Sequence, residues 1–260
     1  MMLVEFKTKL ISVQQRKLSG GITCHDLRIQ NNGSRVLTIS GDVTITIKVL
    51  DLTTKGASRM HSLINSTQHI ISTKLTGTSS PRYGAYLHNF DPKSKKFGTD
   101  SELYTIYYNI NYIVKLEHII MLSQLSGNDF VLAVVDTIGF KSDKYGTSGL
   151  TWGKKGPSTV AYNDWCQYPY IAAHEFFHSL GLPDLFDKND TNSLMYNMNG
   201  RHMTNVSSDE RSKMNNYLIR DIEDMYKGNY TNPSLNTVNN LRTFLNDPTN
   251  GFKYNKAKFR

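Results

Sequence analysis

Residues 169–184 of the chain read PYIAAHEFFHSLGLPD. The proline suits the first turn of a helix and the glycine at position 181 suits a left-handed helix end, so the stretch predicts a helix that stops at the glycine. His174 and His178 are four residues apart and therefore share one face of that helix. Both imidazoles can reach one metal ion, while the carboxylate of Glu175 projects beside them toward a water molecule. The pattern indicates metal-dependent hydrolysis.

Asp184 follows Gly181 by three residues and completes the spacing HExxHxxGxxD. A straight helix cannot supply a third ligand to the same ion from further along its axis, so the chain has to turn sharply. A glycine with positive φ permits this turn and lets the residue three positions later return to the metal. For this composition about 0.00002 accidental matches are expected, so the spacing is informative. Asp187 and Asp190 could compete as ligands, but neither has the glycine-plus-three spacing.

These residues resemble the metzincin zinc peptidases, whose motif HExxHxxGxx ends in His or Asp and is followed by a turn that contains methionine. The residues 192–195, Asn-Ser-Leu-Met, stand where this turn is expected. The segment GLPD is most similar to snapalysin-type peptidases, and GLPDLFD is similar to immune inhibitor A-type peptidases. The resemblance covers residues 171–203.

The resemblance implies a zinc-dependent endopeptidase. Its single catalytic Zn²⁺ would have the ligands His174, His178 and Asp184, and Met195 would pack beneath the metal without binding it. Three protein ligands leave a fourth position for water, as catalytic zinc requires. Glu175 would take a proton during attack on the scissile carbonyl and pass it to the leaving amine. The alternative is a non-catalytic, zinc-stabilised binding module, which would have no need of the Glu175 carboxylate.

The rest of the sequence predicts strands and helices around this motif. Residues 36–52 alternate β-branched and polar side chains around Gly41, which predicts a hairpin or two successive strands. Residues 57–74 place apolar side chains at helical spacing, and residues 130–135 form an apolar run that is typical of a central strand. We expect a mixed α/β (α+β) fold: a metzincin-like twisted sheet with a backing helix, the metal-binding helix, and a smaller C-terminal subdomain with one helix.

The chain is long enough for one large domain. Residues 1–50 are β-rich and are expected in the same unit as a metzincin-like catalytic domain at residues 51–230. Ser207 or Ser208 can cap the helix of the C-terminal subdomain. Residues 231–260 end in a basic cluster, for which we expect a solvated tail rather than a binding patch.

An extended protein or peptide substrate would pair with an edge strand through backbone hydrogen bonds. Residues 150–153 and residues 158–162 are both candidates for that strand, and the sequence does not choose between them.

The composition limits the other partners. The formal charge of +8 and the isoelectric point of about 9.3 would suit nucleic acid, but the chain has no recognisable reading motif, so none is expected. No stretch is long enough to span a bilayer, and the first residues resemble neither a signal peptide nor a membrane anchor. We expect a soluble protein, favour a monomer, and expect action outside the producing cell, either as a secreted enzyme or as an injected toxin. Cys24 and Cys166 could form one disulfide or remain two free thiols.

Overall fold

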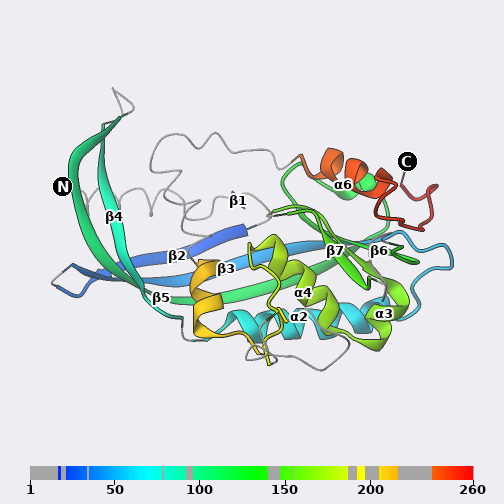
Figure 1. Cartoon of the computed structure of the whole chain (residues 1–260), viewed down its shortest axis with the longest axis horizontal. Coiled ribbons are helices and arrows are strands. Elements are labelled where there is room, and N and C mark those ends of the chain that lie inside the picture. Colours follow the sequence, from blue (N-terminus) through cyan, green and yellow to red (C-terminus); the bar gives the residue numbers. More distant parts are fainter. Residues whose placement is uncertain are drawn as a thin grey trace. The chain divides into compact units, whose positions relative to one another are not determined.

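The computed structural model of the chain describes residues 17–18, 22–33, 35–77, 79–91, 96–139, 147–153, 155–186, 192–196, 205–215 and 236–259. Its named elements, in chain order, are β1 Lys17–Leu18, β2 Ile22–Asn31, β3 Val36–Asp51, α2 Met60–Leu75, β4 Arg82–Asp91, β5 Lys96–Ile119, the 3₁₀ helix η2 Leu122–Gln124, β6 Phe130–Val135, β7 Gly149–Thr151, β8 Ser158–Ala161, α3 Tyr162–Gln167, α4 Tyr170–Ser179 and α6 Thr237–Asn246 (Figure 1). A sheet with both parallel and antiparallel strands is combined with helices in a mixed α/β fold, and this confirms the predicted fold class.

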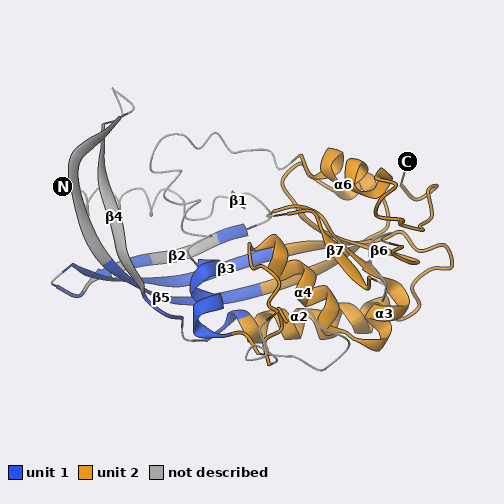
Figure 2. Cartoon of the chain, in the orientation of Figure 1, with its two compact units in different colours: residues 1–45, 75–113, 207–233 blue, residues 46–74, 114–206, 234–260 orange. Residues whose placement is uncertain are grey.

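The chain forms two compact units, which Figure 2 shows in different colours. The first unit contains residues 1–45, 75–113 and 207–233, and the second contains residues 46–74, 114–206 and 234–260. The HExxHxxGxxD motif and the side chains around it belong to the second unit. The predicted limits of a catalytic domain at residues 51–230 remain a prediction.

The first unit is built on antiparallel pairs of strands. Strand β2 pairs with β3, and β4 pairs with β5. Beside these strands, residues 208–215 are helical. Ser207 caps this helix: its hydroxyl accepts a hydrogen bond from the Glu210 amide at 3.1 Å, and the Glu210 carboxylate accepts one from the Ser207 amide at 2.7 Å. This capping box confirms Ser207 as the first of the two predicted caps.

Strand β3 runs without interruption through Gly41, where the sequence predicts a hairpin or two separate strands. Leu37 and Ile39 before the glycine, and Val43 and Ile45 after it, are all buried. These positions have the same parity, so they share one face of the strand, and Gly41 stands at an inward position of that face. The prediction of a break at Gly41 was wrong because the alternation of apolar side chains continues across it.

Strand β6 is the central strand of the second unit. It lies between β3 and β8 and runs parallel to both, and all of its side chains are buried. The Phe130 ring contacts Phe176 of α4 edge to face, with the centroids 5.3 Å apart. Val131 and Ala133 belong instead to an apolar cluster with α6. Because successive side chains of a strand point to opposite faces, α4 and α6 cover opposite faces of β6.

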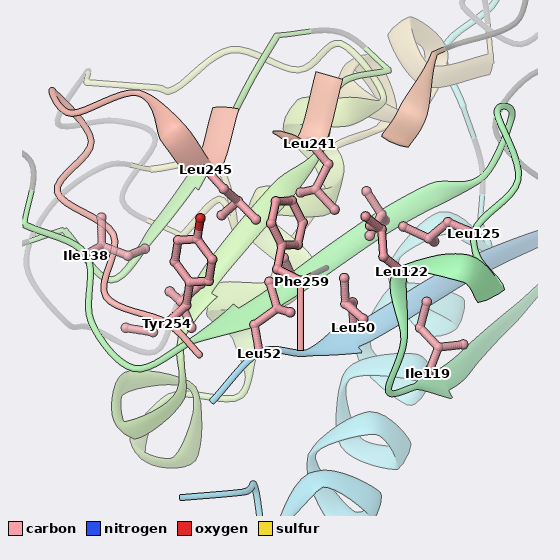
Figure 3. Close-up of a cluster of buried hydrophobic side chains, with 14 residues drawn as sticks. Leu50, Leu52, Ile119, Leu122, Leu125, Ile138, Leu241, Leu245, Tyr254 and Phe259 are labelled. Atoms are coloured by element: carbon pink, nitrogen blue, oxygen red, sulfur yellow. The ribbon is translucent and has the colours of Figure 1, made fainter. Parts of the chain in front are cut away.

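Residues 236–259 are folded, which corrects the prediction of a solvated tail over residues 231–260. Leu241 and Leu245 of α6, together with Tyr254 and Phe259, pack into a cluster with side chains from β3 and β6 (Figure 3). Burying one aromatic side chain stabilises a protein by roughly 1.5–3 kcal/mol. Lys253 and Lys256, which stand between these apolar positions, are exposed, so the net charge of the segment did not predict its packing.

Main-chain contacts also hold this C-terminal segment. Lys253 forms an antiparallel bridge with Thr137, and the Asn255 amide donates to the Leu52 carbonyl at 2.7 Å. The Lys258 ammonium lies 3.3 Å from the buried carboxylate of Asp51. The segment is therefore attached to the ends of both β3 and β6.

Among the described residues, none of the helices has the length and apolar character needed to span a lipid bilayer. Cys166 is a free thiol at a partly buried position. The side chain of Cys24 lies outside the described part of the chain.

Candidate metal centre

Three side-chain atoms from α4 and the turn after it converge on one point. The Nε2 atoms of His174 and His178 lie 3.0 Å apart, and each lies 3.3 Å from Oδ1 of Asp184. Ligand atoms that are about 2.0–2.1 Å from one tetrahedral ion are separated by roughly 3.3–3.4 Å. The three residues could therefore hold one metal ion with little rearrangement.

The turn that brings Asp184 to the histidines depends on Gly181. Its φ is 89°, in the left-handed region that the sequence predicts for this glycine. The Leu182 amide donates to the Phe177 carbonyl at 3.1 Å, and the Gly181 amide donates to the His178 carbonyl at 2.8 Å. These two bonds form a Schellman motif, which ends α4 and reverses the chain.

Each imidazole is oriented by a backbone carbonyl. Nδ1 of His178 lies 2.8 Å from the Leu182 carbonyl oxygen, and Nδ1 of His174 lies 2.7 Å from the Leu194 carbonyl oxygen. A carbonyl can only accept, so both Nδ1 atoms carry the ring hydrogen. The lone pairs of both Nε2 atoms then face the cluster, as metal ligands require.

Asp184 supplies the main test of whether a cation fits. Its Oδ1 is buried, and among the described residues it has no hydrogen-bond donor while the two rings are neutral. Three acceptor atoms then face one another at 3.0–3.3 Å. Such an arrangement is unfavourable unless a proton or a metal ion lies between them. The donor set therefore fits a bound cation.

The charges of the cluster agree with this view. Burial would raise the pKa of Asp184, but the two imidazoles opposite its carboxylate hold that pKa well below the ordinary value. Burial would lower the pKa of His174 and His178, but the Asp184 carboxylate, together with the charge of Glu175, raises both above the ordinary value. Without a metal ion, the Asp184 carboxylate therefore favours the protonated form of the imidazoles. The added proton lies between the three acceptor atoms, where a metal cation would otherwise bind.

Glu175 lies beside the cluster and outside its ligand set. Its side chain is buried, and its Oε2 accepts a hydrogen bond from the Thr151 hydroxyl at 2.7 Å. Burial raises the pKa of this carboxyl above its ordinary value, although the nearby imidazoles and the Thr151 hydroxyl oppose the shift. The group is therefore more basic than an exposed glutamate.

The residues 192–196 form the loop in which the sequence predicts a methionine turn. Met195 is completely buried, and its carbonyl accepts a hydrogen bond from the Leu185 amide at 2.8 Å. The preceding residue, Leu194, supplies the carbonyl that orients His174. The loop therefore supports the cluster through its backbone.

Strand β7 occupies the edge of the sheet next to α4. It pairs antiparallel with β8 and stands last in the order of the described strands. Of the two predicted edge segments, residues 150–153 overlap β7. Residues 158–162 overlap β8, which lies between β6 and β7, so their prediction as an edge strand was wrong.

The structure brings together the four residues that the motif predicts, and Met195 lies in the adjoining loop. The competing aspartates, Asp187 and Asp190, lie outside the described residues. Sequence reasoning missed Thr151 and the two carbonyls that orient the imidazoles. The Leu182 carbonyl is four residues from His178 and belongs to the turn at Gly181. No spacing rule could have found the other two groups, because Thr151 is 24 residues from Glu175 and Leu194 is 20 residues from His174.

Of the comparisons with known proteins, the comparison with solved structures found similar chains. No protein-family model matches the chain, and no curated protein is significantly similar to it. Among solved structures, archaemetzincin from Methanopyrus kandleri is similar with a TM-score of 0.42 and 12% sequence identity, over 67% of this chain and 96% of that chain. The geometry of the metal centre stands independently of this likeness.

Proposed function

We propose that the chain is a zinc-dependent endopeptidase of the metzincin type. The observation that supports this proposal most directly is the convergence of three acceptor atoms, from His174, His178 and Asp184, on one point. A buried carboxylate that is not part of this group, Glu175, lies next to it in sequence and in space. A site that only stored a metal would need the first feature and not the second.

Zinc is the metal that fits this donor set best. Two imidazoles and one carboxylate are borderline-to-hard ligands, and catalytic zinc sites commonly have three protein ligands. When bound, the ion would polarise a carbonyl oxygen and make a water molecule more acidic. We expect one ion per chain.

Glu175 is the proposed general base. Its raised pKa lets the carboxylate take a proton from the water as that water attacks the scissile carbonyl. It then delivers this proton to the amine nitrogen as the C–N bond breaks, so the group ends the cycle as the carboxylate with which it began. His174 and His178 would hold the metal as neutral imidazoles, because the carbonyls keep the ring hydrogen on Nδ1 and leave the Nε2 lone pair for the ion.

The substrate is proposed to be an extended stretch of a protein or peptide. Strand β7 is the edge strand of the described sheet, and its residue Thr151 donates a hydrogen bond to Glu175 of α4. A peptide that adds to this edge through backbone hydrogen bonds would pass close to the metal group. Backbone pairing of this kind favours extended or unfolded substrates.

The test is the Glu175→Gln variant, measured for zinc content and for cleavage of a denatured protein. The amide keeps the size of the side chain but cannot act as a base, so zinc content should stay at about one ion per chain. The cleavage rate should fall roughly 100-fold to 10,000-fold. A variant that keeps its zinc and cuts at the wild-type rate would show that the mechanism is wrong. A wild type that holds zinc and cuts no peptide bond would favour the binding module.

A further inference from the structure

Two residues on the face of β7 that is turned toward α4 contact the side chain of Glu175. Gly149 and Thr151 are two residues apart in the strand, so they share this face. One lies against the Glu175 side chain and the other donates a hydrogen bond to it. We propose that Gly149 and Thr151 are positioning residues that hold the general base in one orientation, an inference that rests on the proposed function.

Gly149 provides the space for the carboxylate. A Cβ atom at this position would lie 2.5 Å from both Cγ and Oε1 of Glu175, closer than carbon and oxygen atoms can approach. The described glycines with positive φ do not include Gly149, so its backbone conformation would accept other residues. The glycine is therefore required by the position of Glu175 and not by the turn of the chain.

Thr151 provides the hydrogen bond. Its Oγ1 lies 2.7 Å from Oε2 of Glu175 and 2.9 Å from the Glu175 carbonyl oxygen. A hydroxyl has one hydrogen, and a carboxylate is the stronger acceptor. The 2.7 Å contact is also at the short distance typical of a hydroxyl bound to a charged oxygen. The hydrogen of Thr151 therefore points to the carboxylate.

Two buried serines make the other hydrogen bonds of this network. The Glu175 carbonyl oxygen therefore does not need the Thr151 hydrogen, which can go to the carboxylate. Ser158 of β8 lies 3.1 Å from the Glu175 carbonyl oxygen and can donate to it. Ser179, at the end of α4, donates to the Gly156 carbonyl at 3.1 Å. Each of the three hydroxyl hydrogens then has its own acceptor, and the network fixes α4 against the two strands.

The arrangement links substrate binding to the base. The same strand would pair with the substrate along the edge that no other described strand occupies, and it would hold Glu175 from its helix-facing side. A misplaced base slows the chemical step more than it weakens binding, because its contact with the attacking water matters most in the transition state. Loss of the Thr151 hydroxyl should therefore lower kcat and leave KM nearly unchanged.

The experiment compares Thr151→Val, which has the same shape without a hydroxyl, with Thr151→Ser, which keeps the hydroxyl. The matched control is Thr159→Val. Thr159 is a buried threonine on the neighbouring strand whose hydroxyl donates to the Leu150 carbonyl at 3.1 Å. For cleavage of a denatured protein, Thr151→Val should lower kcat roughly 10-fold to 100-fold with KM within about twofold. Thr151→Ser should recover to within about threefold, and the control should stay within about twofold of the wild type.

A second readout does not depend on activity. Thermal unfolding of metal-free protein is measured for Thr151→Val, for Glu175→Ala and for both together. A hydrogen bond to the carboxylate predicts that Thr151→Val lowers Tm by about 3–10 °C in the wild-type background and by less than half of that once Glu175 is alanine. Additive changes in Tm, or an unchanged kcat in Thr151→Val, would overturn the positioning role alone. Wild-type protein that cuts no peptide bond would overturn the proposed function, and the positioning role with it.

Discussion

Removal of the Asp184 carboxylate should nearly abolish zinc binding. Oδ1 of Asp184 lies 3.3 Å from Nε2 of both histidines, and it is the only anionic member of the group. Asp184→Ala leaves two neutral imidazoles on one helix face, with their Nδ1 hydrogens still held by carbonyls. Two ligands of this kind form a much weaker site than three.

The size of the loss follows from typical zinc sites. Structural sites with four protein ligands bind zinc with roughly 10–16 kcal/mol, which is about 2.5–4 kcal/mol for each ligand. Losing the contribution of one ligand would therefore raise the dissociation constant for zinc roughly 10²-fold to 10³-fold. At a free zinc concentration of about 100 times the wild-type Kd, the metal stabilises the wild type by roughly 2.7 kcal/mol. The same concentration would stabilise the variant by less than about 0.5 kcal/mol.

The assay is the rise of Tm on addition of zinc to metal-free protein, with zinc content measured in parallel. For a chain of this size the wild type should gain about 5–10 °C and Asp184→Ala less than about 2 °C. Asp187→Ala is the matched control, because Asp187 is the competing aspartate in the same stretch of sequence, and it should behave like the wild type. If Asp184→Ala keeps the full gain while Asp187→Ala loses it, the third ligand has been assigned to the wrong residue.

Three further predictions concern the C-terminal segment, each read from chemical or thermal unfolding. Phe259→Ala should destabilise the protein by roughly 3–5 kcal/mol, because the ring is buried in the cluster of Figure 3, and a loss below about 0.5 kcal/mol would mean that the segment is a solvated tail after all. Gly251→Ala should also be strongly destabilising, since its Cβ would lie 2.3 Å from the Gly139 carbonyl oxygen at a φ of 59°, and a stable variant would contradict this close approach. Asp51→Asn should destabilise by about 1–3 kcal/mol. Burial opposes the charge of Asp51, but the Thr53 hydrogen bonds and Lys258 hold its pKa in the folded protein below 3.8. The difference in stability between the wild type and Asp51→Asn should therefore be at its full size above about pH 4 and shrink as the pH falls through this folded pKa. A difference that grows on acidification would contradict this sign.

The local parts of the metal centre could be predicted because short-range geometry determines them. Four residues of helix bring His174 and His178 to one face in any protein. A left-handed glycine after the last turn reverses the chain, and Gly181 has this conformation at a φ of 89°. The strand at residues 130–135 could be predicted for a similar reason, since a run of apolar side chains is stable only when both faces are covered.

Other predictions failed where the signal was mixed. The basic residues near the end of the chain suggested a solvated tail, although the apolar side chains of Tyr254 and Phe259 between them are buried. Gly41 suggested a break, although the alternation of buried positions on either side of it was continuous. In both cases the pattern of apolar side chains determined the structure, and the single conspicuous residue type did not.

The sequence by itself determined the helix that carries His174 and His178, the turn after it and the set of side chains that can converge there, because helix period and glycine conformation act over a few residues. Only the tertiary structure decided which strand is the edge, which carbonyl orients His174, and which hydroxyl holds Glu175. Those partners lie far away in the chain, as Thr151 and Leu194 do. Their positions depend on how whole strands and helices pack, and no spacing along the sequence encodes a distance that is set by packing.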